Sequence, residues 1–220
     1  FGTELLKRYK QVQMDLEELE IDYSPESDPH FLYDISRKLI EETPDAGNTP
    51  QRICGLLLKN FHSSINSNIE VTGYNDRASV TSTTSKKPGD INEESLSGSI
   101  YKVYEVTVKK FDQLRMQDSV DCISIYNTAN KTEINEVIVL CRPVDCPAEM
   151  DVIGTNLCLG RSILNSITYY FWDIFEWIAM TLQHTTSDGR VTFYSELNEY
   201  ISEVSTAKKV KELWKDIHEN

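Results

Sequence analysis

The sequence lacks several features that would place it in a familiar class. Its five cysteines show no Cys-x-x-Cys spacing and it has only four histidines, which argues against a zinc site and a secreted disulfide scaffold. No run of about 18 apolar residues is present, and no basic start leads into a short apolar stretch. A glycine-rich phosphate loop, a serine-elbow motif and a dinucleotide fingerprint are missing as well. We expect a cytoplasmic protein with reduced thiols, no membrane span and no signal peptide.

An excess of positive charge is also missing. The net charge is −13 at pH 7, whereas proteins that bind nucleic acids usually present a basic surface. The acidity lies mainly in the flanks: residues 61–130 hold seven Lys and Arg against nine Asp and Glu, residues 1–60 seven against twelve, and residues 131–220 eight against fourteen. The overall acidity weakens the case for a DNA-binding protein, but the nearly neutral centre leaves room for one.

The 220 residues, 40% of them hydrophobic, are enough for one domain with a proper core. Apolar spacing of three and four predicts helices over 1–21, 30–43, 48–61 and from 159 to 178, with further helix after 190. β-Branched and aromatic runs predict strands at 69–75, 78–85, 100–111 and 134–143, with a polar and mobile turn at 86–99 and the start of a helix from 112.

This order predicts an α/β domain with a mixed central β-sheet flanked by helices. Residues 1–67 form a helical N-terminal part, residues 68–147 the sheet core and residues 148–220 a helical C-terminal part. The short run at 134–143 is almost entirely apolar, which is typical of a strand covered on both faces.

One carboxylate stands in an unexpected place. Glu105 lies in the middle of the strand "YKVYEVTV" (101–108), and burial of a lone carboxylate costs several kcal/mol (roughly) unless a cation or a proton compensates it. Alternation along the strand puts Glu105 on the same face as Thr107 and Lys109. Asp90, which follows Pro88-Gly89, is close enough in sequence to approach it. Two carboxylates are the ligands that Mg²⁺ prefers.

The segment "PGD" (88–90), followed after a fifteen-residue step by "YEVTVKK" (104–110), resembles the PD-(D/E)xK nuclease superfamily, and within it the type II restriction endonucleases. The resemblance covers about residues 48–142. It implies a restriction-endonuclease-like fold, Mg²⁺-dependent hydrolysis of DNA (Mn²⁺ substituting), Asp90 as the first metal-binding acid and Glu105 as the second. The family's lysine comes two residues after the second acid, where this chain has Thr107. Lys109 is therefore our candidate for the catalytic lysine, with Lys86 or Lys87 as alternatives.

Other residues are weaker candidates. Glu41, Glu42 and Gln51 lie upstream, where some members of the family place an extra ligand, although a solvated helix end is the simpler interpretation of the two glutamates. Arg77, Lys86 and Lys87 are candidate DNA contacts. In the structural alternative, Glu105 only pairs with Lys102, Lys109 or Arg77, and Asp90 is a turn residue.

The sequence thus predicts a metal-dependent endodeoxyribonuclease, either a type II restriction enzyme or its cleavage domain, acting on double-stranded DNA. The alternative is a nuclease-fold module that binds DNA or another partner and has lost catalysis, which Thr107 favours. A homodimer would match a palindromic site. Because the chain begins with Phe1, a recognition domain outside it is the other arrangement we expect.

Overall fold

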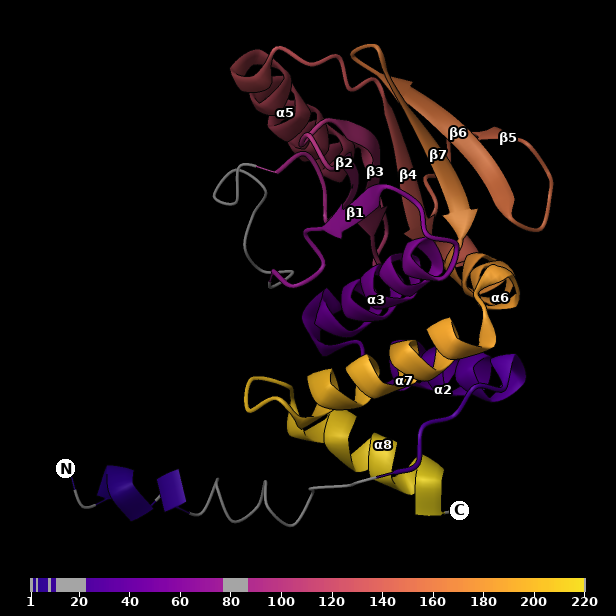
Figure 1. The fold of residues 1–220 in the computed structure, drawn as a ribbon. Coiled ribbons are helices and arrows are strands. Elements are labelled where there is room, and N and C mark those ends of the chain that lie inside the picture. The colour runs from indigo at the N-terminus through magenta and orange to yellow at the C-terminus, as the bar shows by residue number, and fades with distance from the viewer. Residues whose placement is uncertain (1, 3, 8, 11–22, 77–86, 220) are drawn as a thin grey trace.

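The computed structural model describes residues 2, 4–7, 9–10, 23–76 and 87–219. It is a mixed seven-stranded β-sheet flanked by helices (Figure 1), which confirms the predicted fold class. The helices are α2 (Pro29–Glu42), α3 (Asn48–Ser64), α5 (Gln113–Asn130), α6 (Ile174–His184), α7 (Ser187–Ser202) and α8 (Lys208–Glu219), with short 3-10 turns η1 (Asp45–Gly47) and η2 (Pro143–Asp145). The strands are β1 (Ile69–Thr72), β2 (Ile91–Ser95), β3 (Ile100–Val106), β4 (Glu136–Cys141), β5 (Asp151–Val152), β6 (Cys158–Leu164) and β7 (Ile167–Asp173).

The sheet combines two antiparallel wings with a parallel centre. Its strand order is β1-β2-β3-β4-β7-β6-β5. Strands β1, β2 and β3 pair antiparallel, as do β7, β6 and β5, whereas β4 runs parallel to β3 on one side and to β7 on the other. The central strand β4 is buried from Val137 to Cys141, as its apolar sequence predicts for a strand covered on both faces.

Two hydrophobic cores lie on opposite faces of the sheet. Helices α2, α3, α6, α7 and α8 contribute to one core, which includes Tyr104 and Val106 of β3. Helix α5 contributes to the other, which includes Val103 of β3 and Tyr169 of β7. Figure 1 shows α5 well separated from the group of α2, α3, α7 and α8. Because successive side chains of a strand alternate between faces, Glu105 points to the side of α5, on the face predicted for it.

The segment from 159 to 173 is a β-hairpin, so the helix predicted for 159–178 is wrong over most of its length. Strands β6 and β7 pair antiparallel, with Leu164 opposite Ile167. Asn165 and Ser166 between them have positive φ values of 48° and 68°, the backbone of a two-residue hairpin turn. The spacing of Ile163, Ile167 and Phe171 suited a helix, but the β-branched and aromatic run "ITYYFW" favours a strand.

Helix α6 begins only at Ile174, where Asp173 caps it by accepting hydrogen bonds from the backbone N–H groups of Phe175 and Glu176. The C-terminal part is therefore not purely helical, because β5, β6 and β7 belong to the same sheet as the predicted core.

The segment after Asp90 is a strand, so the mobile polar turn predicted for 86–99 is wrong over β2, whereas residues 96–98 do form a turn between β2 and β3. Strand β2 pairs with both β1 and β3, and its Ile91, Asn92 and Glu93 are buried. The sequence did not predict β2 as a strand because three of its five residues are Asn or Glu. The strand predicted for 78–85 lies outside the described residues, and so does most of the predicted helix 1–21. In the described part of the chain, no helix is long and apolar enough to cross a membrane.

Candidate functional site

Asp90 is fixed at the entrance to β2 by close backbone packing. Its Oδ2 accepts a hydrogen bond of 2.9 Å from the backbone N–H of Val106, at the end of β3. A Cβ on Gly89 would lie 2.4 Å from Val103 Cγ1 and 2.9 Å from the carbonyl oxygen of Tyr104, and a Cβ on Gly73 would lie 2.4 Å from the carbonyl oxygen of Asp90. The glycine of the "PGD" segment is therefore what lets Asp90 approach β3.

Gly89→Ala is expected to push the Asp90 segment away from β3, because a buried strand must shift to accept the methyl group. Overpacking of this kind costs about 1–3 kcal/mol of unfolding free energy, measurable by urea denaturation. Gly2→Ala is the matched control, since a Cβ there has no atom within 4 Å. Equal stability of the two variants would show that the close approach at Gly89 is unimportant.

Glu105 faces α5 from the adjacent strand. Its Oε1 accepts a hydrogen bond of 3.1 Å from Ser119 Oγ, and its side chain is half-buried, as is that of Asp90. The two carboxyl groups are within hydrogen-bonding reach of each other. Because Asp90 precedes β2 and β2 pairs antiparallel with β3, the hairpin brings together two acids that are fifteen residues apart, as the sequence predicts.

Burial is the main cause of the raised pKa values of Asp90 and Glu105. It raises the pKa of Glu105 well above its ordinary value, and the nearby charge of Asp90 raises it further. Burial also raises the pKa of Asp90, although the Val106 N–H, the Arg115 charge and the hydrogen bond with Glu105 oppose the increase. Two carboxylates that share a site cannot both ionise easily. Burial and the neighbouring charge therefore both disfavour ionisation of Glu105.

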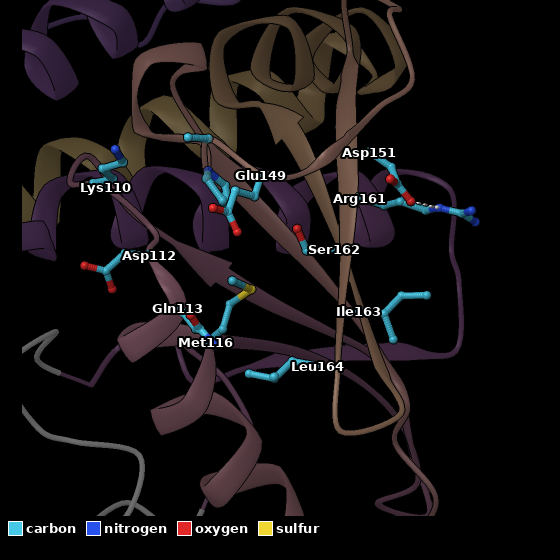
Figure 2. Close-up of a pocket in the computed structure, with 12 residues that line it drawn as sticks. Lys110, Asp112, Gln113, Met116, Glu149, Asp151, Arg161, Ser162, Ile163 and Leu164 are labelled. Carbon is cyan, nitrogen blue, oxygen red and sulfur yellow. Dashed lines mark ion pairs between the residues drawn. The ribbon is translucent and has the colours of Figure 1, made fainter.

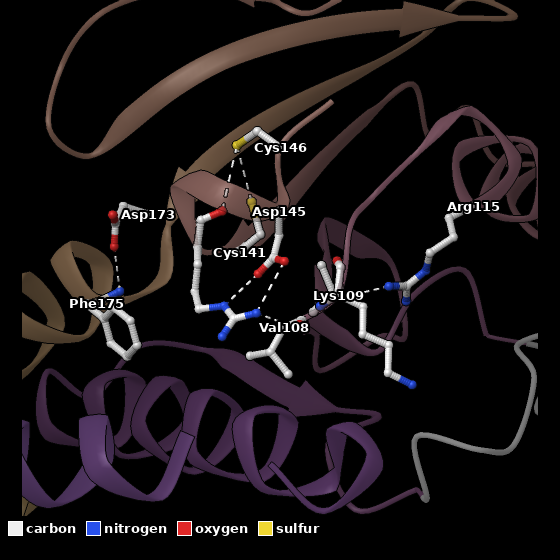
Figure 3. A network of polar contacts seen from close by, with 10 residues as sticks. Val108, Lys109, Arg115, Cys141, Asp145, Cys146, Asp173 and Phe175 are labelled. Atoms are coloured by element: carbon white, nitrogen blue, oxygen red, sulfur yellow. Dashed lines mark hydrogen bonds and ion pairs between the residues drawn. The ribbon is translucent and has the colours of Figure 1, made fainter. Parts of the chain in front are cut away.

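The cation beside this pair is Arg115 of α5. Its guanidinium donates a hydrogen bond to Thr107 Oγ1 and lies over the ring of Phe111, 5.4 Å from the centroid. Lys109 is exposed, and its backbone N–H donates to Thr107 Oγ1 over 3.0 Å. Its side chain points away from the Arg115 guanidinium (Figure 3). A catalytic role for Lys109 stays a prediction.

The side chain of Arg142 connects the end of β4 to the segment after β3. Arg142 donates to the carbonyl oxygen of Val108 over 2.7 Å and forms an ion pair with Asp145 at 2.6 Å (Figure 3). Beside it, the Sγ atoms of Cys141 and Cys146 lie 3.6 Å apart, and both thiols are free. The Arg142 contact with Val108 holds the backbone next to Thr107, whose hydroxyl accepts a hydrogen bond from Arg115.

The carboxylate pair suits a hard divalent cation. Within the described ranges, no three His, Cys, Asp or Glu side chains gather into a metal-binding group, so a metal here would take two protein carboxylates and keep several waters, as Mg²⁺ commonly does. The buried Oε1 of Gln51 has no hydrogen-bond partner, while its Nε2 lies 3.5 Å from the carbonyl oxygen of Asp90. The Gln51 amide nitrogen therefore holds the backbone of the Asp90 segment, and an amide oxygen is an atom of the kind that Mg²⁺ accepts as a ligand.

The other predicted residues lie apart from the pair or outside the description. Lys87 forms an ion pair of 2.9 Å with Asp76, while Arg77 and Lys86 fall outside the described residues. Glu41 pairs with Arg37 at 3.2 Å on α2, and Glu42 is exposed at the end of the same helix, as expected of solvated glutamates.

Lys102, one of the cationic partners proposed for Glu105 in the structural alternative, pairs with a different acid. Lys102 lies 3.9 Å from the buried Glu93, on the opposite face of the sheet. There Glu93 also accepts a hydrogen bond of 2.8 Å from Tyr104 and lies 3.2 Å from His62. Of the partners named for Glu105, Arg77 is outside the described residues and Lys109 is exposed.

A groove with a volume of about 500 Å³ runs along the face of the sheet that carries α5. Figure 2 shows Asp112 and Gln113 on one side of it and Arg161 and Ile163 of β6 on the other. Its charged lining residues are two bases, Lys110 and Arg161, and three acids, Asp112, Glu149 and Asp151. This excess of acid does not suit a phosphate backbone.

Sequence reasoning missed Arg115 and Ser119 because both lie on a helix outside the acid motif. Asp112 gave a usable signal, since it precedes the helix and accepts from the backbone N–H of Arg115 as its N-cap. An N-cap three residues before an arginine places that arginine in the first turn, next to the end of β3.

No protein-family model matches this chain, and a comparison with curated proteins finds no similar sequence.

Proposed function

We propose that the protein is a Mg²⁺-dependent endonuclease that hydrolyses phosphodiester bonds of double-stranded DNA. The observation that carries this proposal is the pair of half-buried carboxyl groups, Asp90 and Glu105, whose pKa values are both raised. Burial opposes ionisation of both acids, and Asp90 further opposes ionisation of Glu105, so the pair is costly for the fold. Such perturbed groups concentrate at functional sites, and a divalent cation would remove the cost.

In this proposal Asp90 and Glu105 would hold the metal. A divalent metal held by these two carboxylates would supply Lewis acidity to the reaction. The chain itself keeps Asp90 oriented through the Val106 N–H and Glu105 through Ser119 Oγ. In the net reaction, a water oxygen forms a bond to phosphorus and the bond to the leaving sugar oxygen breaks. One water proton ends on that leaving oxygen.

The DNA backbone is expected to approach along the connection between β3 and α5. Lys109 and Lys110 are exposed on this connection, whereas the groove along β6 is lined by more acids than bases. The protein acts either as a homodimer or together with a separate recognition domain. Its molecular mass in solution, measured with and without DNA, distinguishes these two predictions.

The direct test is incubation of plasmid and phage DNA, methylated and unmethylated, with the protein and Mg²⁺ or Mn²⁺. We expect conversion of supercoiled plasmid to nicked or linear DNA, and no conversion in EDTA. Discrete fragments would identify a restriction enzyme. A folded protein that binds Mn²⁺ but cuts none of these substrates would contradict the nuclease proposal.

A second candidate is a module that keeps the nuclease fold but binds DNA without cutting it. Thr107 in the position of the family's lysine favours it, because the cation that usually accompanies the two acids is absent from that position. Retardation of DNA in a gel without cleavage in Mn²⁺, unaffected by Glu105→Gln, is the result expected of such a module.

A further inference from the structure

The geometry points to Arg115 as the cation of the carboxylate site. In this chain that cation comes from helix α5, and not from the strand that carries Glu105. We propose that Arg115 is the counter-ion of the Asp90–Glu105 pair in the metal-free protein and contacts the scissile phosphate when DNA is bound. This assignment rests on the proposed nuclease function. It concerns the guanidinium as an electrostatic group, since an arginine side chain stays protonated in proteins and neither gives nor takes a proton in the hydrolysis.

The position of Arg115 is fixed by three separate contacts. Asp112 Oδ1 accepts a hydrogen bond of 3.1 Å from the backbone N–H of Arg115 and so sets the start of α5. The guanidinium donates to Thr107 Oγ1 and lies over the ring of Phe111. A guanidinium fixed in this way is already oriented toward the end of β3, which lowers the entropy lost on contact with a phosphate.

The charge of Arg115 acts on both acids. It lowers the pKa of Asp90 and that of Glu105, against the larger effect of burial on each. Among the described residues, it is the cation whose charge is felt by both groups. The guanidinium therefore stands where it can attract the same negative charges that would bind a metal, and where phosphate charge would develop during hydrolysis.

Thr107 is a positioning residue in this arrangement. Its hydroxyl accepts from the backbone N–H of Lys109 over 3.0 Å and from Arg115, and donates to the carbonyl oxygen of Lys109 over 2.9 Å. It is buried, with 4% of its surface exposed. A lysine at this position would remove the anchor of the guanidinium, so Thr107 and Arg115 work as one unit.

The test compares Arg115→Met and Arg115→Lys, with Arg37→Met on α2 as the matched control. Two quantities are measured: Mn²⁺ affinity by calorimetric titration in the absence of DNA, and the single-turnover cleavage rate at saturating Mn²⁺. Arg115→Met is expected to tighten Mn²⁺ binding about fivefold, because a competing positive charge is removed, and to slow cleavage about a hundredfold, because a charge that stabilises the transition state is lost. Arg115→Lys should retain the wild-type Mn²⁺ affinity and show intermediate cleavage.

Opposite changes in affinity and rate distinguish this role from a structural one, because a misfolded site would lose both. If the wild-type protein is active and Arg115→Met leaves both Mn²⁺ affinity and cleavage rate unchanged, the assignment of Arg115 alone is overturned. A loss of cleavage rate in Lys109→Met would then assign the catalytic role to Lys109. A wild-type protein that neither binds Mn²⁺ nor cuts DNA would overturn both the assignment and the nuclease function.

Discussion

Glu105→Gln is expected to reduce metal-dependent cleavage of DNA by about a thousandfold. The substitution keeps the size of the side chain, and its amide oxygen can still accept the hydrogen bond from Ser119 Oγ, but it removes one of the two charges that attract a divalent ion. The Lewis acidity of such an ion is worth several kcal/mol, and each 1.4 kcal/mol changes a rate by about tenfold. Single-turnover cleavage of plasmid DNA at fixed Mg²⁺ measures the effect.

Asp90→Asn should reduce cleavage by a similar factor, because it too removes one of the two charges that attract the metal. The fold should be preserved, since the asparagine side-chain oxygen can still accept the hydrogen bond from the Val106 N–H. Glu136→Gln is the matched control, because this exposed acid begins β4 and points to the opposite face of the sheet. Undiminished cleavage by either acid variant would show that the pair does not hold the metal.

The same Glu105→Gln substitution is expected to make the metal-free protein more stable at pH 8, by about 1–3 kcal/mol of unfolding free energy. Each unit by which folding raises a carboxyl pKa destabilises the ionised protein by about 1.4 kcal/mol, and the raised pKa of Glu105 is due to burial first and to Asp90 second. Urea denaturation in EDTA measures the gain, which corresponds to about 2–4 °C in melting temperature per kcal/mol for a chain of this size.

The gain should depend on pH with a definite sign. Below the ordinary carboxyl pKa, Glu105 is protonated in both the folded and the unfolded chain and contributes no difference. As the pH rises above that value toward the raised folded pKa, the unfolded chain loses its proton first, so the wild-type protein loses stability relative to the variant. The difference between the two proteins is therefore small at pH 4 and large at pH 8.

Metal should reverse the order of stability. Saturation at 100 times the dissociation constant stabilises the wild-type protein by about 2.7 kcal/mol through mass action, whereas the Glu105→Gln variant should gain little from Mg²⁺. If Glu105 were paired only with a structural cation, its replacement would lower stability in EDTA and leave the response to metal unchanged.

The acid pair could be predicted from sequence because its determinants are local. The strand "YKVYEVTV" alternates between two faces, and Gly89 allows Asp90 to reach the end of β3. The helix-flanked sheet was predictable for a related reason, since helix α3 and strands β3 and β4 each show strong apolar patterns.

The remaining errors arise where sequence patterns are ambiguous or nonlocal. β2 is nearly as polar as a turn, yet it lies between β1 and β3 in the sheet and its first three residues are buried. The spacing in β6 and β7 fits a helix as well as a hairpin, and the structure shows the hairpin through the antiparallel pairing of the two strands and the positive φ angles at Asn165 and Ser166. Arg115 was missed because its distance from Glu105 depends on how α5 packs on the sheet.

The placement of both acids on a single antiparallel wing has a consequence for the order of folding. Asp90 and Glu105 meet through one short-range pairing, which closes a small loop at low entropic cost. In contrast, β4 pairs with partners 32 to 34 residues away on either side, Val139 with Phe171 and Tyr104 with Ile138. We therefore expect the two carboxylates to come together while water still surrounds them, so that the energetic cost of their burial arises later, when α5 packs onto this wing. A growing chain can thus form the acid pair before the residues that complete the sheet have been synthesised.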